Sequence, residues 1–160
     1  MALNGVHTLG AGEANQTGHD GTFTEGEETK FNNKYYKIML DNNTVWEQVL
    51  SEPTEDNPNL PEWQWDGYSA MDGTQKIGMK LDTDFELFYD LQLISEDGLA
   101  GCRPPNGIGE EALPLCPRYP TYDIGEIYAN DRNTWAGDFV IVLDKMLLNK
   151  VDLGGLRDLI

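Results

Sequence analysis

Apolar side chains recur at spacings of three and four in several separate stretches of the chain. The longest stretch is 122–148, whose apolar positions predict one amphipathic helix. A shorter run with the same spacing lies at 84–94, where Thr83 provides an N-cap for a second helix. Residues 34–49 favour helical segments that are interrupted near Asn42.

The remaining segments are a short N-terminal helix and three long loops. Residues 1–10 are mostly apolar and end at glycine, which predicts a short helix. Residues 11–30, 51–75 and 97–122 are rich in polar residues, glycine or proline and show no sustained periodicity. Because no convincing alternating strand pattern is found, the predicted fold class is mainly α.

The charge balance is strongly acidic. The 160 residues include 28 Asp and Glu against 11 Lys and Arg, a formal net charge of −17. This argues against nucleic acid or an anionic membrane as a partner, and no stretch approaches the ~20 apolar residues of a membrane span. A solvated acidic surface that aids solubility is the simplest explanation, and a cationic protein partner is the alternative. No signal peptide is visible, so the compartment stays open.

The two cysteines, Cys102 and Cys116, lie fourteen residues apart in a loop rich in proline and glycine. They would form one disulfide in an oxidising compartment, or remain two free thiols in the cytosol. Neither has the spacing of a metal-binding motif.

A histidine near the N-terminus has the strongest chemical context. His7 lies on an apolar stretch, where a lone histidine is more often a core residue than a ligand. Five segments, in chain order, change that balance: Gly5-Val6-His7-Thr8-Leu9-Gly10, Thr17-Gly18-His19-Asp20-Gly21-Thr22-Phe23, Phe31-Asn32-Asn33-Lys34-Tyr35-Tyr36, Gly78-Met79-Lys80-Leu81-Asp82-Thr83-Asp84-Phe85-Glu86-Leu87, and Tyr128-Ala129-Asn130-Asp131 with Trp135 and Asp138-Phe139. Together they resemble motifs of the plant-type heme peroxidases, the superfamily of cytochrome c peroxidase, ascorbate peroxidase and the secreted plant and fungal peroxidases.

The resemblance implies a heme b cofactor whose iron is bound by His7. It implies that Asp84 accepts a hydrogen bond from Nδ1–H of His7, which would make the imidazole a stronger donor to iron. Phe23, sixteen residues after His7, takes the place of the proximal aromatic residue. The implied activity is reduction of hydrogen peroxide coupled to oxidation of a second substrate, which stays unidentified.

The resemblance covers only the second, proximal half of the family fold. Met1 falls inside the proximal helix, so residues 1–160 correspond to the C-terminal part of one peroxidase domain, with insertions at about 51–75 and 97–122. The distal arginine and histidine of the family have no counterpart, and the missing distal half is the implied partner. Whether the chain alone folds, binds heme or turns over stays open.

A proximal potassium or calcium site is a further implication. Thr8 and Thr24 match positions that bind this cation in ascorbate and secreted peroxidases. Asn32 stands where the family has a carboxylate ligand, and a hard cation prefers anionic oxygen, which weakens the expectation. Glu13 also departs from the family and would repel a heme propionate.

Two other functions compete with the peroxidase interpretation. One is a non-catalytic remnant that keeps the heme-binding half and little else. The other is an acidic secreted binding module, in which Trp63, Trp65 and Tyr68 form a binding patch and His7 is a core residue.

Overall fold

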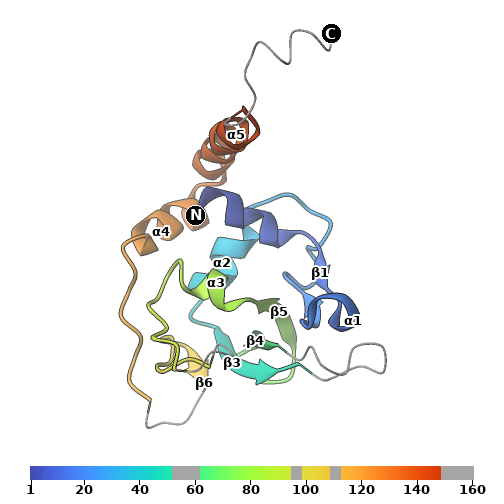
Figure 1. Ribbon diagram of the computed structural model, residues 1–160, viewed down its shortest axis with the longest axis vertical. Coiled ribbons are helices and arrows are strands. Elements are labelled where there is room, and N and C mark those ends of the chain that lie inside the picture. The colour runs from blue at the N-terminus through green and yellow to red at the C-terminus, as the bar shows by residue number, and fades with distance from the viewer. Residues whose placement is uncertain (52–61, 95–98, 109–112, 149–160) are drawn as a thin grey trace.

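The computed structural model describes residues 1–51, 62–94, 99–108 and 113–148. Helices gather around the N-terminus and a sheet lies at the opposite end (Figure 1). The helices are the 3-10 helix η1 (Ala2–Thr8), α1 (Ala14–Thr17), α2 (Lys34–Leu40), α3 (Asp82–Phe85), α4 (Tyr122–Asn130) and α5 (Arg132–Leu148).

The larger sheet has four strands in the order β5-β4-β3-β6. They are β3 (Thr44–Leu50), β4 (Trp63–Ser69), β5 (Lys76–Lys80) and β6 (Gly107–Ile108). The β5–β4 and β4–β3 pairs are antiparallel, and β6 pairs in parallel with β3. A separate antiparallel ribbon joins β1 (Ala11–Gly12) to β2 (Gly21–Thr22).

The prediction of a mainly α fold is wrong, because 37% of the described residues are helical and 22% are in strands. The clearest error concerns residues 44–49, which were expected to be helical and belong to β3. Val45 and Val49 have a helical spacing. The first residues of the strand nevertheless alternate in burial, because Thr44 and Trp46 are buried and Glu47 is exposed. Threonine, valine and tryptophan fit a pleated surface, and pairing with β4 settles this ambiguous run as a strand.

The two helices predicted after residue 83 are also revised. The helix expected over 84–94 shrinks to the four residues of α3, after which the chain continues in turns and loop. The single helix expected over 122–148 is two helices, because Asp131 has extended backbone angles. The Asp131 carboxylate then accepts hydrogen bonds from the backbone N–H groups of Asn133 and Thr134, which caps the start of α5.

The two predicted insertions lie partly outside the described residues, at 52–61, 97–98 and 109–112. Within the described part, residues 63–69 form β4 instead of the expected loop. The second segment is mostly loop, as expected, and contributes β6.

The core is dominated by aromatic side chains. Its fully buried members include Tyr35, Tyr36, Trp46, Phe85, Phe88 and Trp135, which meet in edge-on and tilted ring contacts. Such pairs stabilise a core beyond the area that they bury. The sheet and the helices therefore share one cluster, with α3 between them.

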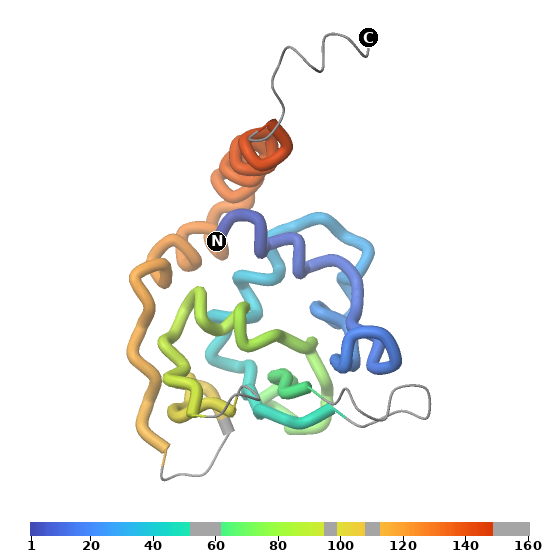
Figure 2. The backbone as a smooth tube through the Cα atoms, in the orientation of Figure 1, coloured from blue at the N-terminus to red at the C-terminus, as the bar shows by residue number. Residues whose placement is uncertain are grey.

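Helix α5 leaves this core after its first turns. Trp135 is buried and Phe139 is half-buried, but Val140, Ile141 and Leu147 are all more than half exposed. Figure 2 shows this helix protruding from the body of the molecule. Among the residues that the structure describes, no helix combines the length and apolarity needed to cross a membrane.

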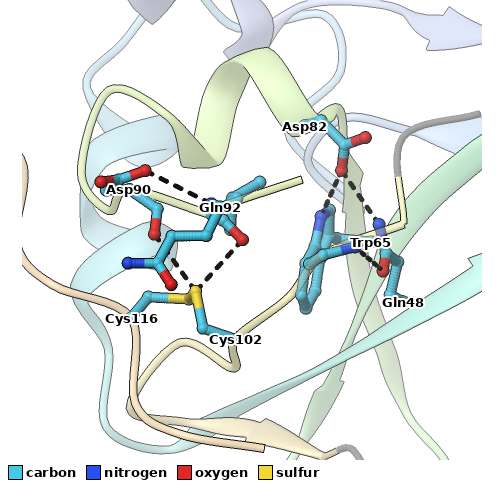
Figure 3. The surroundings of a disulfide bond; sticks show 9 residues. Gln48, Trp65, Asp82, Asp90, Gln92, Cys102 and Cys116 are labelled. Atoms are coloured by element: carbon cyan, nitrogen blue, oxygen red, sulfur yellow. Dashed lines mark hydrogen bonds between the residues drawn. A yellow bond between two sulfur atoms is a disulfide. The ribbon is translucent and has the colours of Figure 1, made fainter. Parts of the chain in front are cut away.

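Cys102 and Cys116 form a disulfide, which resolves the choice left open by the sequence (Figure 3). The bridge closes the segment 102–116, which contains β6, and Cys116 N–H also donates to Arg103 O. Both cysteines are buried, so the bridge belongs to the core cluster.

Removing this disulfide should lower stability markedly. For a closed loop of about 15 residues, the chain-entropy model gives about 3 kcal/mol. The double variant Cys102→Ser, Cys116→Ser should lose about this much free energy of unfolding in urea titrations. Reductant should destabilise the parent chain but not the variant, and an equal response of both would contradict a structural bridge.

Candidate functional site

His7 and Asp84 meet across 77 residues of sequence. His7 lies in the last turn of η1, and its Nδ1 is 2.8 Å from Oδ1 of Asp84 at the N-terminal end of α3. A carboxylate only accepts, so Nδ1 carries a proton, and in the neutral imidazole Nε2 keeps its lone pair. No hydrogen bond to Nε2 is found within the described residues, and the His7 side chain is 26% exposed. The neutral imidazole therefore presents Nε2, a nitrogen able to bind a metal, toward solvent.

The Asp84 carboxylate is fully buried and is held by two further donors. Tyr35 Oη donates to Oδ1 at 3.0 Å, and the backbone N–H of Leu81 donates to Oδ2 at 3.0 Å. The bond from Leu81 also makes Asp84 a capping residue of α3, so the structural and the histidine-orienting roles coexist. Burial and the neighbouring Asp84 charge raise the pKa of Tyr35 well above its usual value, which keeps the phenol a donor.

The start of α3 is anchored to the sheet. Asp82 Oδ1 accepts hydrogen bonds from Trp65 Nε1 on β4 at 2.7 Å and from Gln48 Nε2 on β3 at 3.2 Å (Figure 3). Two neighbouring carboxylates on one short helix thus face different partners. The sheet fixes the position of α3, and α3 holds the Asp84 carboxylate within hydrogen-bonding distance of His7 Nδ1.

Phe23 covers one face of the His7 ring. The two rings stack with centroids 4.3 Å apart and planes inclined by 11°. The backbone of this segment is bound on both sides, because Phe23 N–H donates to Gly10 O and Glu25 N–H donates to Ile77 O. A Cβ at Gly78 would lie 2.5 Å from Phe23 O, so glycine is required for β5 to approach this closely.

A lysine that the sequence analysis overlooked lies in the same cluster. Lys80 is fully buried, and its Nζ donates to Phe23 O and, at 3.0 Å, to Met79 O. Burial lowers the pKa of Lys80 to about 8, although the Asp84 charge acts in the opposite direction. The sequence gives little indication that Lys80 is buried. It lies between the apolar residues Met79 and Leu81, and a strand at the surface would show the same pattern.

The two threonines of the expected cation site are buried and have backbone partners. Thr8 Oγ1 donates to Asn32 O at 2.8 Å and accepts from Tyr35 N–H at 3.2 Å, which ties η1 to α2. Thr24 Oγ1 donates to His7 O at 3.4 Å. In the described part of the chain, neither hydroxyl bonds to a carboxylate, so the geometry gives these residues a structural role.

Glu13 and His19 lie outside the His7 cluster. Glu13 is exposed and accepts a hydrogen bond from Gln16. Burial lowers the pKa of His19, whose Nδ1 has no hydrogen-bond partner in the described structure. Within the described residues, neither side chain forms a hydrogen bond, ion pair or ring contact with His7, Asp84 or Phe23.

Within the described residues, no group of three or more His, Cys, Asp or Glu side chains is arranged to hold a metal ion. A ligand set of that kind is not needed by a cofactor that carries its own equatorial ligands, as heme does. No protein-family model matches this chain, and no curated protein or solved structure matches it either. The peroxidase resemblance therefore depends on the motifs and on the geometry around His7.

The charge on buried Lys80 should appear in the pH dependence of stability. Its pKa is about 8 in the folded chain and about 10.5 when unfolded, so between these values the unfolded chain binds more protons at this residue. The free energy of unfolding should therefore rise with pH across this window, by about 3 kcal/mol in total.

Lys80→Met should remove this rise, as measured by urea unfolding at several pH values between 7.5 and 10.5. Lys76→Met is the matched control, because Lys76 lies on the same strand but is partly exposed and paired with Asp66. The assignment is wrong if Lys80→Met keeps the pH dependence of the parent chain.

Proposed function

We propose that this chain is the heme-binding half of a heme peroxidase, with His7 as the axial ligand of the iron. The observation that carries the proposal is the buried Asp84 carboxylate on Nδ1 of a histidine whose Nε2 is free. This arrangement fits a single axial ligand, because the donor nitrogen is exposed while the rest of the ring is fixed. Heme b, when bound, would supply the redox chemistry with hydrogen peroxide, which protein side chains alone do not provide.

The side chains of this chain orient and tune the donor nitrogen. Asp84 holds the proton on Nδ1, so His7 stays in the tautomer that leaves Nε2 available. The negative charge of Asp84 strengthens the imidazole as a donor and favours the higher oxidation states of iron. Tyr35 and the Leu81 N–H hold the carboxylate in place, which limits rotation of the imidazole.

Phe23 supports the same role by packing. Its ring lies nearly parallel to the imidazole and restricts the tilt of His7. Phenylalanine is much harder to oxidise than the tryptophan found at this position in cytochrome c peroxidase and ascorbate peroxidase. We therefore propose that Phe23 packs against the site and does not carry a protein radical.

Acid–base groups for peroxide cleavage are not assigned in this chain. General acid–base catalysis typically contributes about 10²–10⁴-fold, so efficient turnover requires groups from a partner. That partner is the distal half of the domain in this proposal, and hydrogen peroxide and an unidentified reductant are the substrates. Peroxide turnover by the heme-loaded chain alone should therefore be no faster than by free hemin, and the alternative of a non-catalytic heme-binding remnant predicts the same result.

The alternative of an aromatic binding module receives less support. Trp65 is 2% exposed and its Nε1 is bonded to Asp82, so it belongs to the core. Trp63 and Tyr68 are half-buried strand residues of β4. The three aromatic residues therefore do not make one open surface.

His7→Ala should abolish the heme spectrum of protein reconstituted with hemin. The change removes the only nitrogen that the proposal assigns to the iron. Absorption spectroscopy during hemin titration measures the loss, and His19→Ala is the matched control because the chain has only two histidines. Retention of the parent spectrum in His7→Ala would rule out axial ligation by His7.

Asp84→Asn should raise the reduction potential of the bound heme, because the shape is kept and the negative charge is lost. Heme affinity should fall by roughly 10–100-fold, as is common when the partner of a ligating histidine is changed. Spectroelectrochemistry measures the potential. Asp82→Asn, on the same helix but bonded to Trp65 and Gln48, should shift it less. Equal shifts in both variants would contradict a specific role for Asp84.

A further inference from the structure

Lys80 is an ammonium group buried without an ion-pair partner. Its side chain is inaccessible to solvent, and in the described structure no carboxylate lies within ion-pair distance of Nζ. Two backbone carbonyls accept hydrogen bonds from it, and the centres of the Tyr35 and Trp46 rings lie 5.5 and 5.9 Å from Nζ. Carbonyl oxygens and aromatic faces both stabilise a cation, so these contacts offset part of the cost of burying the charge.

Such a group is costly as a purely structural element. Desolvation of an ammonium group is expensive, and an apolar side chain of similar volume often fills the same space with no loss of stability. Residues that break the ordinary rules of core composition are commonly functional. The charge of Lys80 therefore calls for a role that methionine or leucine would not fill.

Lys80 is linked to both residues that hold the His7 ring, Phe23 and Asp84. Through Phe23 O it holds the segment whose ring stacks on the imidazole. On its other side it faces the Tyr35 ring, and Tyr35 Oη donates to the same Asp84 oxygen that contacts His7. The charges of Lys80 and Asp84 interact through this low-dielectric interior, where water screens little.

We infer that Lys80 is a positioning residue that tunes His7: its buried positive charge offsets Asp84, and its bond to Phe23 O fixes the stacked ring. The cation stabilises the Asp84 anion and makes it a weaker acceptor, so the Nδ1–H bond of His7 is moderated. Less negative charge then reaches Nε2. This inference rests on the proposed role of His7 where iron is concerned, but its effect on the His7–Asp84 bond exists without any cofactor.

The first test uses the cofactor-free chain at pH 7. Nuclear magnetic resonance of ¹⁵N-labelled protein reports the Nδ1–H proton of His7. Lys80→Met and Lys80→Gln should move this resonance downfield, because an Asp84 without its opposing charge accepts more strongly. Lys80→Arg keeps the charge and should stay near the parent value, and glutamine retains a donor for Phe23 O. The inference is overturned if the neutral variants leave the resonance unchanged, or if arginine shifts it as much as they do.

The second test uses the heme-loaded chain and measures its reduction potential. The neutral variants should lower the potential, opposite in sign to Asp84→Asn, while Lys80→Arg should leave it near that of the parent chain. A fall of equal size in Lys80→Arg would mean that packing, and not charge, is responsible, and would overturn the inference. Failure of the parent chain to bind heme would refute the proposed function alone, and the first test would still decide the role of Lys80.

Discussion

The burial of one carboxylate, that of Asp84, constrains the whole site. An anion removed from water is tolerated only when its oxygens are hydrogen-bonded, and removing its partners from such a group commonly costs several kcal/mol. Three donors meet that requirement: His7 from η1, Tyr35 from α2 and the Leu81 N–H at the start of α3. These donors come from three separate parts of the chain, so satisfying one anion brings together the segments that surround the candidate heme ligand.

The supports of Asp84 reach well beyond its own contacts. Asp82 ties α3 to β3 and β4 through Gln48 and Trp65, so the four-stranded sheet acts as the base on which α3 rests. Thr8 ties η1 to α2, which carries Tyr35. The His7 ring is therefore fixed on the side of Nδ1 and free on the side of Nε2. A rigid histidine with one open nitrogen is what axial ligation requires.

The charges buried next to the site are balanced, in contrast to those of the whole chain. The chain has a formal net charge of −17, yet next to the site one buried carboxylate, Asp84, is accompanied by one buried ammonium, Lys80. Tyr35 contacts both groups, because its ring faces the Lys80 ammonium and its hydroxyl donates to Asp84. The acidic excess therefore belongs mainly to the exposed surface, where water solvates it.

The sequence by itself was sufficient for features that depend on local spacing or on motif order. The periodicity at 34–40 identified α2, and the order of the motifs placed His7, Phe23 and Asp84 in one site, which the structure brings into contact. It was insufficient for β3 and β4, because a strand is stabilised by its partner and Val45 and Val49 suit a helix equally well. The exposure of Lys80 was likewise decided only by tertiary structure. The same lysine is solvated on an open strand and buried here, since Phe23, Tyr35 and Trp46 from distant segments enclose it.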